Sequence, residues 1–396
     1  MRSTVFHTLS QVPRGSWNLL AKRAGLYSSY EWLCSVEQET QGACRYLLVN
    51  ADDGRPAGAL PLYFTQRETN WYYDARFHFA ELPPNGAGGT SCVAGNRRGY
   101  RNEPLLAEWL TDRQQDEVLR ALLDGVRETA WEHGSDFAAF LYLSGHAKSL
   151  FDIAVSGSCG TVPRPVLGYG GDAWIDIHGI SMADHLAAVS PKRRGLIRRE
   201  MRHFSKHGLR ITVEDPRKYV EKILYLVGQL AEKYGTENPD DEVRSLLERP
   251  EPALGAAARL FACWDGDTMV GMALGYEWGD RLYMRIAGFD YDRLPGAFEY
   301  FNTVIYEPLQ HCYRAGLRGL HLGSGSHQAK ALRGARIEPL VSLVLPLGKL
   351  LSTDPVNASA RRTARRYWEG QFAAIPNAFD QGRWTRLLDL CSLPGE

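Results

Sequence analysis

Residues 261–346 carry the clearest pattern of apolar and polar segments in the chain. Three apolar runs are separated by two Gly-Asp pairs, at 266–267 and 279–280, and such pairs are typical of turns between antiparallel strands. Apolar side chains then recur every three or four residues, the spacing of one helix face, at Phe298, Phe301, Ile305, Leu309 and Cys312. Gly316 is suited to end this helix, and residues 317–322 have the composition of a buried strand. The pattern predicts a three-stranded meander, then a helix, then a strand.

A second pattern predicts an amphipathic helix that begins after Ser190. This serine is a favourable N-cap, Pro191 suits the first helical position and Gly208 suits the stop. On a helical projection the basic side chains form one row with two further cations beside it, and together they are Lys192, Arg194, Arg198, Arg199, Arg202 and Lys206. Apolar side chains fall on the opposite side. The helix therefore has one basic face and one face suited to a core.

The first half of the chain repeats the plan of strands, helix and strand. In order, the pattern predicts a helix at 17–24, a hairpin formed by 44–50 and 57–64, an aromatic strand at 70–79, an irregular segment at 83–104, a helix at 103–133 and a strand at 137–143. Residues 172–178 are expected to lead into the second half, where 216–234 form a helix ending at Gly235 and 236–252 a charged connection. The fold class is therefore predicted as α/β (α+β), with two tandem domains, each a mixed, largely antiparallel sheet flanked by helices.

Length and composition set the limits of this prediction. A chain of 396 residues can form two domains, each with its own core, and the expected divisions are 1–170, 171–350 and a helical tail at 351–396. Hydrophobic residues make up 44% and charged residues 23%, as in an ordinary globular protein. Basic and acidic residues number 46 each, so the overall charge favours neither DNA nor a membrane. An anionic partner has to be met by a local basic surface.

The cysteines indicate a reducing compartment. There are seven, at positions 34, 44, 92, 159, 263, 312 and 391, and no two of them form a CxxC pair. This scatter favours reduced thiols over a disulfide framework or a zinc site, and no metal site is expected. The N-terminal residues lack the apolar core of a signal peptide, and no run reaches the length of a membrane span. A cytoplasmic protein without membrane insertion is the expectation.

A polar glycine turn follows the strand at 317–322. Its letters are GSGSHQAK, residues 323–330, and Arg333 and Gly334 come shortly after. Meander, helix, strand and this turn resemble, over roughly 185–346, the second half of the GNAT N-acetyltransferase fold. More narrowly, they resemble the branch that holds the Fem peptidoglycan-bridge aminoacyl transferases and their acyltransferase relatives. The resemblance implies that the two predicted domains are tandem GNAT-like domains, with the catalytic turn in the second.

The resemblance also implies roles for residues of the turn. Acyl transfer needs a cation or hydrogen-bond donors near the developing oxyanion and a base for the incoming amine. Lys330 matches the lysine of the closing motif and is expected to stabilise that charge, while His327 can take the amine proton. Tyr300, near the start of the preceding helix, is a weaker acid–base candidate. The alternative is that Lys330 is a surface lysine and His327 an ordinary turn residue.

Residues 293–298 bear on which molecule donates the acyl group. GNAT enzymes that use coenzyme A carry an Arg/Gln-x-x-Gly-x-Gly/Ala loop that holds the pyrophosphate. Arg293 and Gly296 match this donor loop, but Phe298 stands where the family has Gly or Ala and is expected to crowd a phosphate. The resemblance therefore favours an aminoacyl-tRNA donor, with acyl-coenzyme A as the alternative co-substrate and no tightly bound cofactor.

Two basic surfaces bear on an RNA partner. The first is the basic helix face between 191 and 206, and the second is a cluster near the C-terminus made by Arg361, Arg362, Arg365 and Arg366. Rows of cations suit phosphates, and Tyr367 and Trp368 are positioned to stack on an unpaired base or to enter the core. Solvated helix faces are the simpler interpretation.

The expected function is an aminoacyl transferase that moves an aminoacyl group from tRNA to the amine of a small molecule or cell-wall precursor. The alternatives are an acyl-coenzyme A N-acyltransferase and a non-catalytic GNAT-like protein that binds RNA or another partner. Which acceptor is used and which group is transferred do not follow from the sequence.

Overall fold

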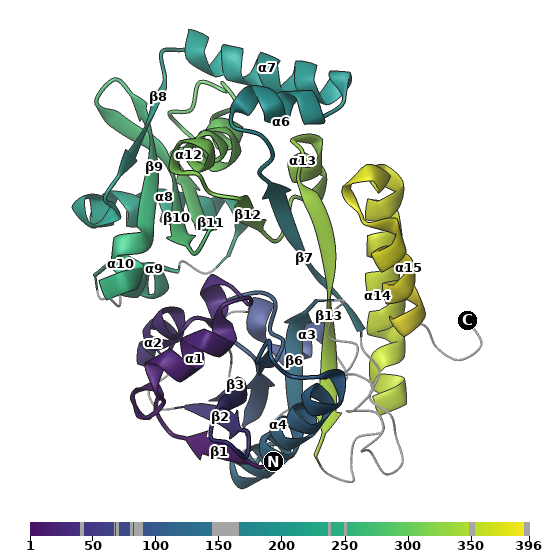
Figure 1. The fold of residues 1–396 in the computed structure, drawn as a ribbon. Coiled ribbons are helices and arrows are strands. Elements are labelled where there is room, and N and C mark those ends of the chain that lie inside the picture. Colours follow the sequence, from purple (N-terminus) through teal and green to yellow (C-terminus); the bar gives the residue numbers. More distant parts are fainter. Residues whose placement is uncertain are drawn as a thin grey trace. The chain divides into compact units, whose positions relative to one another are not determined.

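The computed structural model of the protein describes residues 1–39, 43–66, 68, 71–79, 82, 90–144, 166–236, 239–248, 252–347 and 353–391 (Figure 1). Cys159 and residues 83–89 of the predicted irregular segment lie outside the described residues. The chain divides into unit 1, residues 1–171 with 338–396, and unit 2, residues 172–337. The predicted division near residue 170 lies beside this one. Residues 338–350 and the helical tail group with unit 1 rather than with the second domain or by themselves.

Unit 1 is a mixed sheet flanked by helices. Its strands lie in the order β1 (Ser3–Phe6), β2 (Cys44–Asn50), β3 (Pro56–Thr65), β4 (Ser91–Ala94), β6 (Phe137–Leu143) and β13 (Arg336–Pro346), with β5 (Leu105–Leu106) on β3. The helices are α1 (Arg14–Ala21), α2 (Tyr30–Glu39), α3 (Ala75–His78), α4 (Asp112–Glu132), α14 (Thr353–Ala374) and α15 (Gln381–Cys391). Neighbouring strands are antiparallel except β4 and β6. The predicted hairpin is β2–β3, and the predicted buried strand is β6.

Three predictions in unit 1 were wrong. Residues 71–79 do not form a strand but contain a short 3₁₀ turn and α3, because the Asp74 carboxylate accepts the Arg76 N–H and starts a helix. The segment 83–104, predicted to be irregular, contains the buried strand β4. The predicted helix at 103–133 begins only at Asp112, after a Thr111–Gln114 capping box, because its first leucines pair with β3 as β5.

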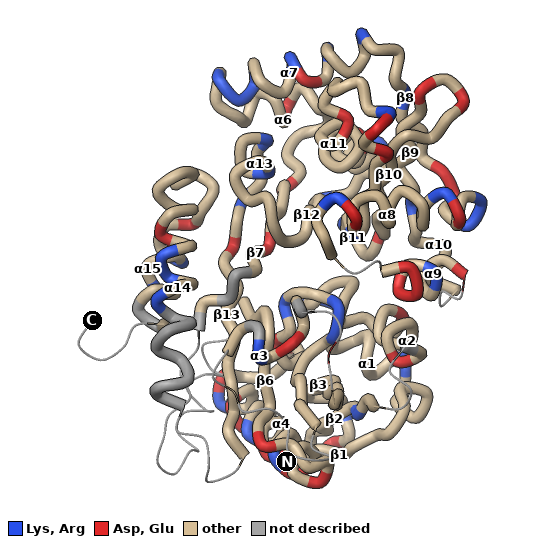
Figure 2. Tube along the Cα trace, turned by 180° about the vertical axis from the view of Figure 1, so that it is seen from behind, with Lys and Arg blue, Asp and Glu red and all other residues tan. Residues whose placement is uncertain are grey.

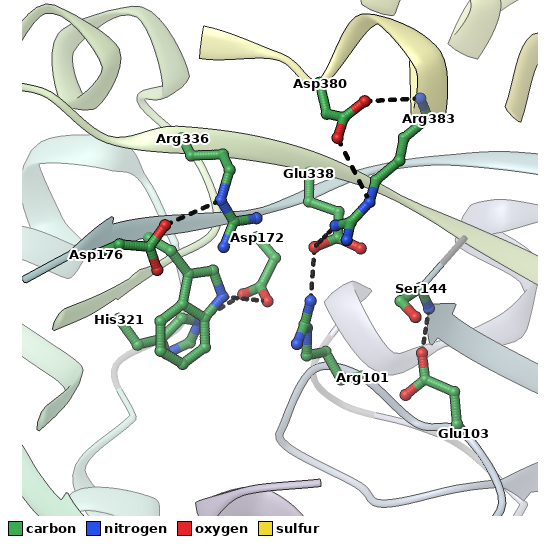
Figure 3. Close-up of polar contacts among 11 residues, drawn as sticks. Arg101, Glu103, Ser144, Asp172, Asp176, His321, Arg336, Glu338, Asp380 and Arg383 are labelled. Carbon is green, nitrogen blue, oxygen red and sulfur yellow. Dashed lines mark hydrogen bonds and ion pairs between the residues drawn. The ribbon is translucent and has the colours of Figure 1, made fainter. Parts of the chain in front are cut away.

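The C-terminal helices are part of the core of unit 1. Trp368 of α14 is fully buried and lies against Phe379, which also contacts Trp384 of α15. A buried carboxylate holds the end of this group, since Glu338 of β13 accepts a hydrogen bond of 2.5 Å from Arg101 and lies 3.8 Å from Arg383 (Figure 3). The suggestion that Trp368 stacks on a base was therefore wrong, and its alternative, the core, is what is observed.

Unit 2 contains the meander and helices predicted from residues 261–346. Its strands lie in the order β7 (Val166–Asp176), β12 (Gly319–Gly323), β11 (Arg281–Phe289), β10 (Thr268–Trp278), β9 (Ala258–Asp265) and β8 (Arg210–Glu214). The helices are α6 (Met182–Ala188), α7 (Pro191–Lys206), α8 (Val220–Tyr234), α9 (Asp240–Glu248), α10 (Pro252–Ala257), α11 (Glu299–Phe301), α12 (Glu307–Ala315) and α13 (His327–Leu332), with a π-helix at Asn302–Tyr306. The predicted mixed α/β class is confirmed, because helices flank a mixed, largely antiparallel sheet in each unit (Figure 1).

In unit 2, turns and helix ends occur at the glycines and N-caps that the sequence predicted. Gly266 and Gly279 have φ of 55° and 60° in the two meander turns, and Gly316 ends α12 with φ of 67°. Ser190 caps α7 through the Arg193 N–H, and Gly235 ends α8. One prediction was wrong here: residues 236–252 are not a mere connection, because α9 occupies most of them. Its Val243, Leu246 and Leu247 are buried, its Asp241 and Glu248 are exposed, and its Glu242 pairs with Arg285 of β11.

Candidate functional site

The site in unit 2 begins where two parallel strands stop pairing. β11 and β12 pair in parallel over three residue pairs, and the last pair is Tyr283 with His321. β11 continues to Phe289 without this partner, so the sheet opens beyond His321. Open carboxyl ends of parallel strands are common places for ligands in α/β proteins. The glycine turn predicted to be catalytic follows β12 at this opening.

Lys330 holds the turn from within. Its side chain is 3% exposed, and its ammonium donates hydrogen bonds to the carbonyl oxygens of Leu322 at 2.7 Å, Gly323 at 3.2 Å and Ser324 at 2.8 Å. An ammonium has three N–H donors, and here backbone carbonyls use all three. The alternative of a surface lysine was wrong. The geometry makes Lys330 a residue that positions the turn, and its contact with a donor ester stays a prediction.

Burial lowers the pKa of Lys330 to about 7, and the nearby Asp172 carboxylate offsets part of this effect. A buried charge is disfavoured, so this group binds a proton less readily in the folded chain than in the unfolded one.

This shift gives a pH dependence of stability. Between pH 7 and about 10 the unfolded chain keeps the Lys330 proton while the folded chain loses it. The contribution of Lys330 to the free energy of unfolding therefore increases with pH over this range. Urea unfolding at several pH values is expected to show a steeper rise for the wild type than for Lys330→Met. Parallel curves for the two proteins would contradict this explanation, since every other titrating group is common to both.

A buried histidine–aspartate pair lies on the neighbouring strands (Figure 3). Asp172 of β7 is 0% exposed and His321 of β12 is 1% exposed, and the Asp172 Oδ1 lies 2.5 Å from the His321 Nε2. The other carboxylate oxygen accepts the Trp174 indole N–H at 2.6 Å. The carboxylate thus fixes the imidazole in one orientation. Such a pair is able to move protons when the other ring nitrogen meets an amine.

Two aromatic rings lie against this pair. Trp174 lies 4.5 Å and Tyr283 lies 5.4 Å from the His321 ring, centroid to centroid. Sequence reasoning missed the pair because each member was assigned to a strand on its apolar neighbours. The available signal was a charged or titratable residue inside an otherwise apolar run, as in DAWIDI and LRGLHL.

A buried ion pair ties the basic helix to the helix that carries Lys330. Glu200 of α7 and Arg333, next to α13, are 2% and 5% exposed, and their side chains meet at 2.5 Å and 3.1 Å. The Tyr306 hydroxyl also bonds Glu200, and the Arg333 guanidinium lies 3.2 Å from the Phe301 ring centroid. Tyr306 belongs to the π-helix, an element common at functional sites. The inner face of α7 is thereby fixed to the end of α13, the helix that carries Lys330.

Most of the predicted basic row is exposed on α7, whose lysines and arginines are marked along the Cα trace in Figure 2. The exposed members are Lys192, Arg198, Arg199, Arg202 and Lys206. Arg194 departs from the row, because its guanidinium donates to the Leu186, Ala187 and Val189 carbonyls and so closes the end of α6. We call the five exposed residues the basic face.

The donor loop, residues 293–298, is followed by Glu299, whose carboxylate binds one of its backbone N–H groups. Arg293 is exposed and lies 3.7 Å from Asp290, and Gly296 has φ of 76° with open space around it. The Ala297 N–H, however, is bound at 2.9 Å by the Glu299 carboxylate, which is 4% exposed. A phosphate at this loop has to displace that carboxylate or lie beside a negative charge. Phe298 adopts a left-handed conformation and contacts the His203 ring of α7.

The remaining predicted residues do not join this site as one group. His327 is buried at the start of α13, and Tyr300 packs between Phe289 and Phe301, where burial raises its pKa. Of the second basic cluster, which lies on α14 of unit 1, Arg362 and Arg366 are exposed and Arg365 pairs with Glu369. Arg361 is in the same helix, but its side chain is outside the description.

Neither metal ligands nor a membrane span were found in the described part of the chain. Among those residues, no three His, Cys, Asp or Glu side chains are grouped so that they can hold a metal ion. Within the same ranges, no helix is both long and apolar enough to cross a bilayer. The described cysteines, at 34, 44, 92, 263, 312 and 391, are free thiols.

One part of the chain matches a known domain family. Residues 191–331 are similar to the acetyltransferase (GNAT) domain family. This matched part is less than half of the chain. It contains the basic face, the donor loop, the opening between β11 and β12, and the turn held by Lys330. No curated protein matches the chain at a significant level.

Solved structures share the fold of most of the chain. FemX superimposes with a TM-score of 0.54 at 12% identity, covering 88% of this chain and 98% of FemX. The C-terminal domain of a protein described as a lysylphosphatidylglycerol synthetase, from Agrobacterium fabrum, gives 0.52 at 12% identity, with 90% and 97% covered. L-PGS from Bacillus licheniformis gives 0.51 at 11% identity, with 89% and 96% covered. At these identities the likeness concerns the fold, and the predicted resemblance to a Fem-like GNAT fold is confirmed.

The GNAT domain and this fold make acyl transfer the supported class of activity. The donor, the acceptor and the roles of single residues are not fixed by the comparisons.

Proposed function

We propose that the protein forms an amide bond by moving an aminoacyl group from an aminoacyl-tRNA to the amine of a small molecule or cell-wall precursor. The observation that carries this proposal is the construction of α7. Its outer side bears the exposed basic face, and its inner side is locked through Glu200 and Arg333 to the helix of Lys330. A polyanion bound to α7 is thereby held at a fixed place relative to the turn. The cytoplasm, where aminoacyl-tRNA is made, is the proposed location.

The chemistry assigned to the site is aminolysis of an ester. The acceptor nitrogen attacks the ester carbonyl carbon and forms the new C–N bond, and the C–O bond to the tRNA ribose breaks. The amine proton passes to a base, and a proton is returned to the departing ribose oxygen. We assign the base to His321, oriented by Asp172, with His327 as the other candidate. Lys330 positions the turn through the carbonyl oxygens of Leu322, Gly323 and Ser324.

The second candidate is an acyl-coenzyme A N-acyltransferase. The exposed Arg293 and the open Gly296 favour it, since they match the phosphate-binding loop of such enzymes. Glu299 weighs against it, because its buried carboxylate already takes the Ala297 N–H. Calorimetry is expected to show weak binding of coenzyme A. Low-micromolar affinity for the wild type would reverse the order of the two donors.

Reversing charge on the basic face tests the first candidate. Arg198→Glu with Arg202→Glu is expected to weaken tRNA binding and to reduce the slope of log affinity against log salt by roughly 1.5 to 2. Both side chains are exposed, so the fold is expected to remain intact. The measurement is a filter or fluorescence titration at four salt concentrations.

The matched control reverses two exposed arginines of α4 in unit 1, Arg113→Glu with Arg120→Glu. It changes the net charge by the same amount, so a general loss of attraction to RNA appears in both variants. If the α7 variant and the wild type have the same tRNA affinity and salt slope, α7 does not bind RNA. Its basic face is then an ordinary solvated surface.

A further inference from the structure

Two tyrosines of α8 are exposed. Tyr234 is 67% and Tyr225 is 47% exposed, while Ile223, Leu226 and Val227 of the same helix are buried in the core. A single exposed aromatic ring is ordinary, but several that gather with cations indicate a binding surface. Nine residues separate the two tyrosines, which is about 13 Å along the helix axis and half a turn around it. The two rings therefore flank α8, and residues 290–291 lie against both, because Asp290 contacts Tyr225 and Tyr291 contacts Lys233.

Lysines and a third tyrosine complete the group. The Lys233 Nζ lies 3.4 Å from the ring centroid of Tyr291 and 5.9 Å from that of Tyr234. At the other end, the Lys222 Nζ lies 4.5 Å from the Tyr225 ring centroid. We call Tyr225, Tyr234 and Tyr291, with Lys222 and Lys233, the tyrosine cluster. Its rings give stacking faces and its ammonium groups can meet phosphates.

Acidic groups keep the net charge of this surface small. Asp290 is 4% exposed and lies 3.4 Å from the Tyr225 hydroxyl and 3.7 Å from Arg293, and Asp292 is exposed beside it. Lys222, Lys233 and Arg293 thus face two carboxylates. Binding here has to depend more on stacking than on charge, unlike binding to the basic face of α7.

The segment after β11 connects the tyrosine cluster with α7. It begins at Asp290 and Tyr291 beside α8, and it ends at Phe298, whose ring lies 5.5 Å from that of His203 on α7. All of these residues belong to unit 2. The basic face and the tyrosine cluster are thus linked through one segment, residues 290–298.

On this basis we propose that the tyrosine cluster stacks the unpaired nucleotides at the 3′ end of the donor tRNA. The inference rests on the proposed function. The phosphates of the tRNA helix are bound by α7, and the single-stranded end, whose bases are free to stack, crosses α8. Base–aromatic stacking tolerates any sequence, as a transferase that must accept one common 3′ end requires. The adenine of coenzyme A offers the same stacking chemistry, so the experiment has to separate the two sources.

The test is a set of titrations with two variants at one position. Tyr234→Phe keeps the ring and Tyr234→Leu removes it at similar volume, so stacking and mere apolar contact give different results. The probes are a short single-stranded RNA that ends in CCA and carries 2-aminopurine, an RNA duplex without overhang, deacylated tRNA, and coenzyme A. Trp131→Leu on α4 of unit 1 is the matched control, because Trp131 is also 67% exposed.

We expect Tyr234→Leu to weaken binding of the single-stranded RNA about 5- to 150-fold, with Tyr234→Phe and Trp131→Leu close to the wild type. The salt slope is expected to stay unchanged, and duplex binding to be unaffected. Wild-type affinity of Tyr234→Leu for the single-stranded RNA, with tRNA still bound through α7, would overturn this inference alone. Binding of coenzyme A through Tyr234, without binding of any RNA, would overturn both the inference and the tRNA donor.

Discussion

Replacing Lys330 by methionine is expected to reduce turnover by at least about 10²-fold while donor binding is kept. The side chain is buried, and its ammonium is the common partner of the Leu322, Gly323 and Ser324 carbonyls. Without it, three buried acceptors lose their donor and the turn that follows β12 moves. A displacement of about 1 Å at a reacting centre can cost 10²-fold in rate. Single-turnover measurement with a competent donor separates this loss from any loss of binding.

Two further variants serve as comparisons for Lys330→Met. Lys330→Arg is expected to recover little, because a planar guanidinium does not fit a slot in which three carbonyls surround one nitrogen. Lys218→Met removes an exposed lysine of unit 2 and is expected to turn over as the wild type does. Near wild-type turnover of Lys330→Met would show that the turn keeps its shape without the ammonium.

Local signals were sufficient to predict much of unit 2. The meander was fixed by Gly266 and Gly279, because each turn needs a left-handed residue and glycine adopts that conformation at no cost. Helix α7 was fixed by Ser190, whose side-chain oxygen accepts the Arg193 N–H, and by Pro191, whose ring sets the backbone of the first turn. Such elements depend on neighbours within four residues. The sequence therefore contains the information that determines them.

Predictions failed where partners distant in the sequence, or a single cap, decided the outcome. Residues 70–79 have the aromatic composition of a strand, yet Asp74 starts a helix there. Leu105 and Leu106 have helical spacing with later residues, yet their backbone pairs with β3. A strand is completed by its neighbour, and hydrophobic spacing alone does not identify that neighbour.

The site was the least predictable part, for the same reason. Lys330 was found by resemblance, but its use of three carbonyls depends on how the turn folds back on it. Glu200 is an acid within a basic helix, and its partner Arg333 lies 133 residues away. Asp172 and His321 are 149 residues apart and meet only because β7 and β12 are paired. Buried polar residues inside apolar runs were the signal that sequence reasoning passed over.

Replacing Asp172 by asparagine is expected to reduce turnover about 10²- to 10⁴-fold, the range of general acid–base catalysis. The carboxylate bonds the His321 Nε2, so this nitrogen carries the proton and the other ring nitrogen is left as the base. An asparagine amide can donate to Nε2 instead, which moves the proton to the nitrogen that has to accept it. Asparagine has nearly the same volume and can still accept the Trp174 N–H, so the strands are expected to stay paired.

The control lies on the same strand. Asp176→Asn changes a half-exposed carboxylate that pairs with Arg336 at 3.3 Å, and it is expected to leave turnover unchanged (Figure 3). Raising the pH is expected to return part of the activity of Asp172→Asn, because a larger share of the acceptor amine is then neutral and needs no base. A loss that is equal at every pH, with normal thermal stability, would exclude His321 as the base. His327 on α13 would then be the candidate that remains, since it lies at the same turn as Lys330.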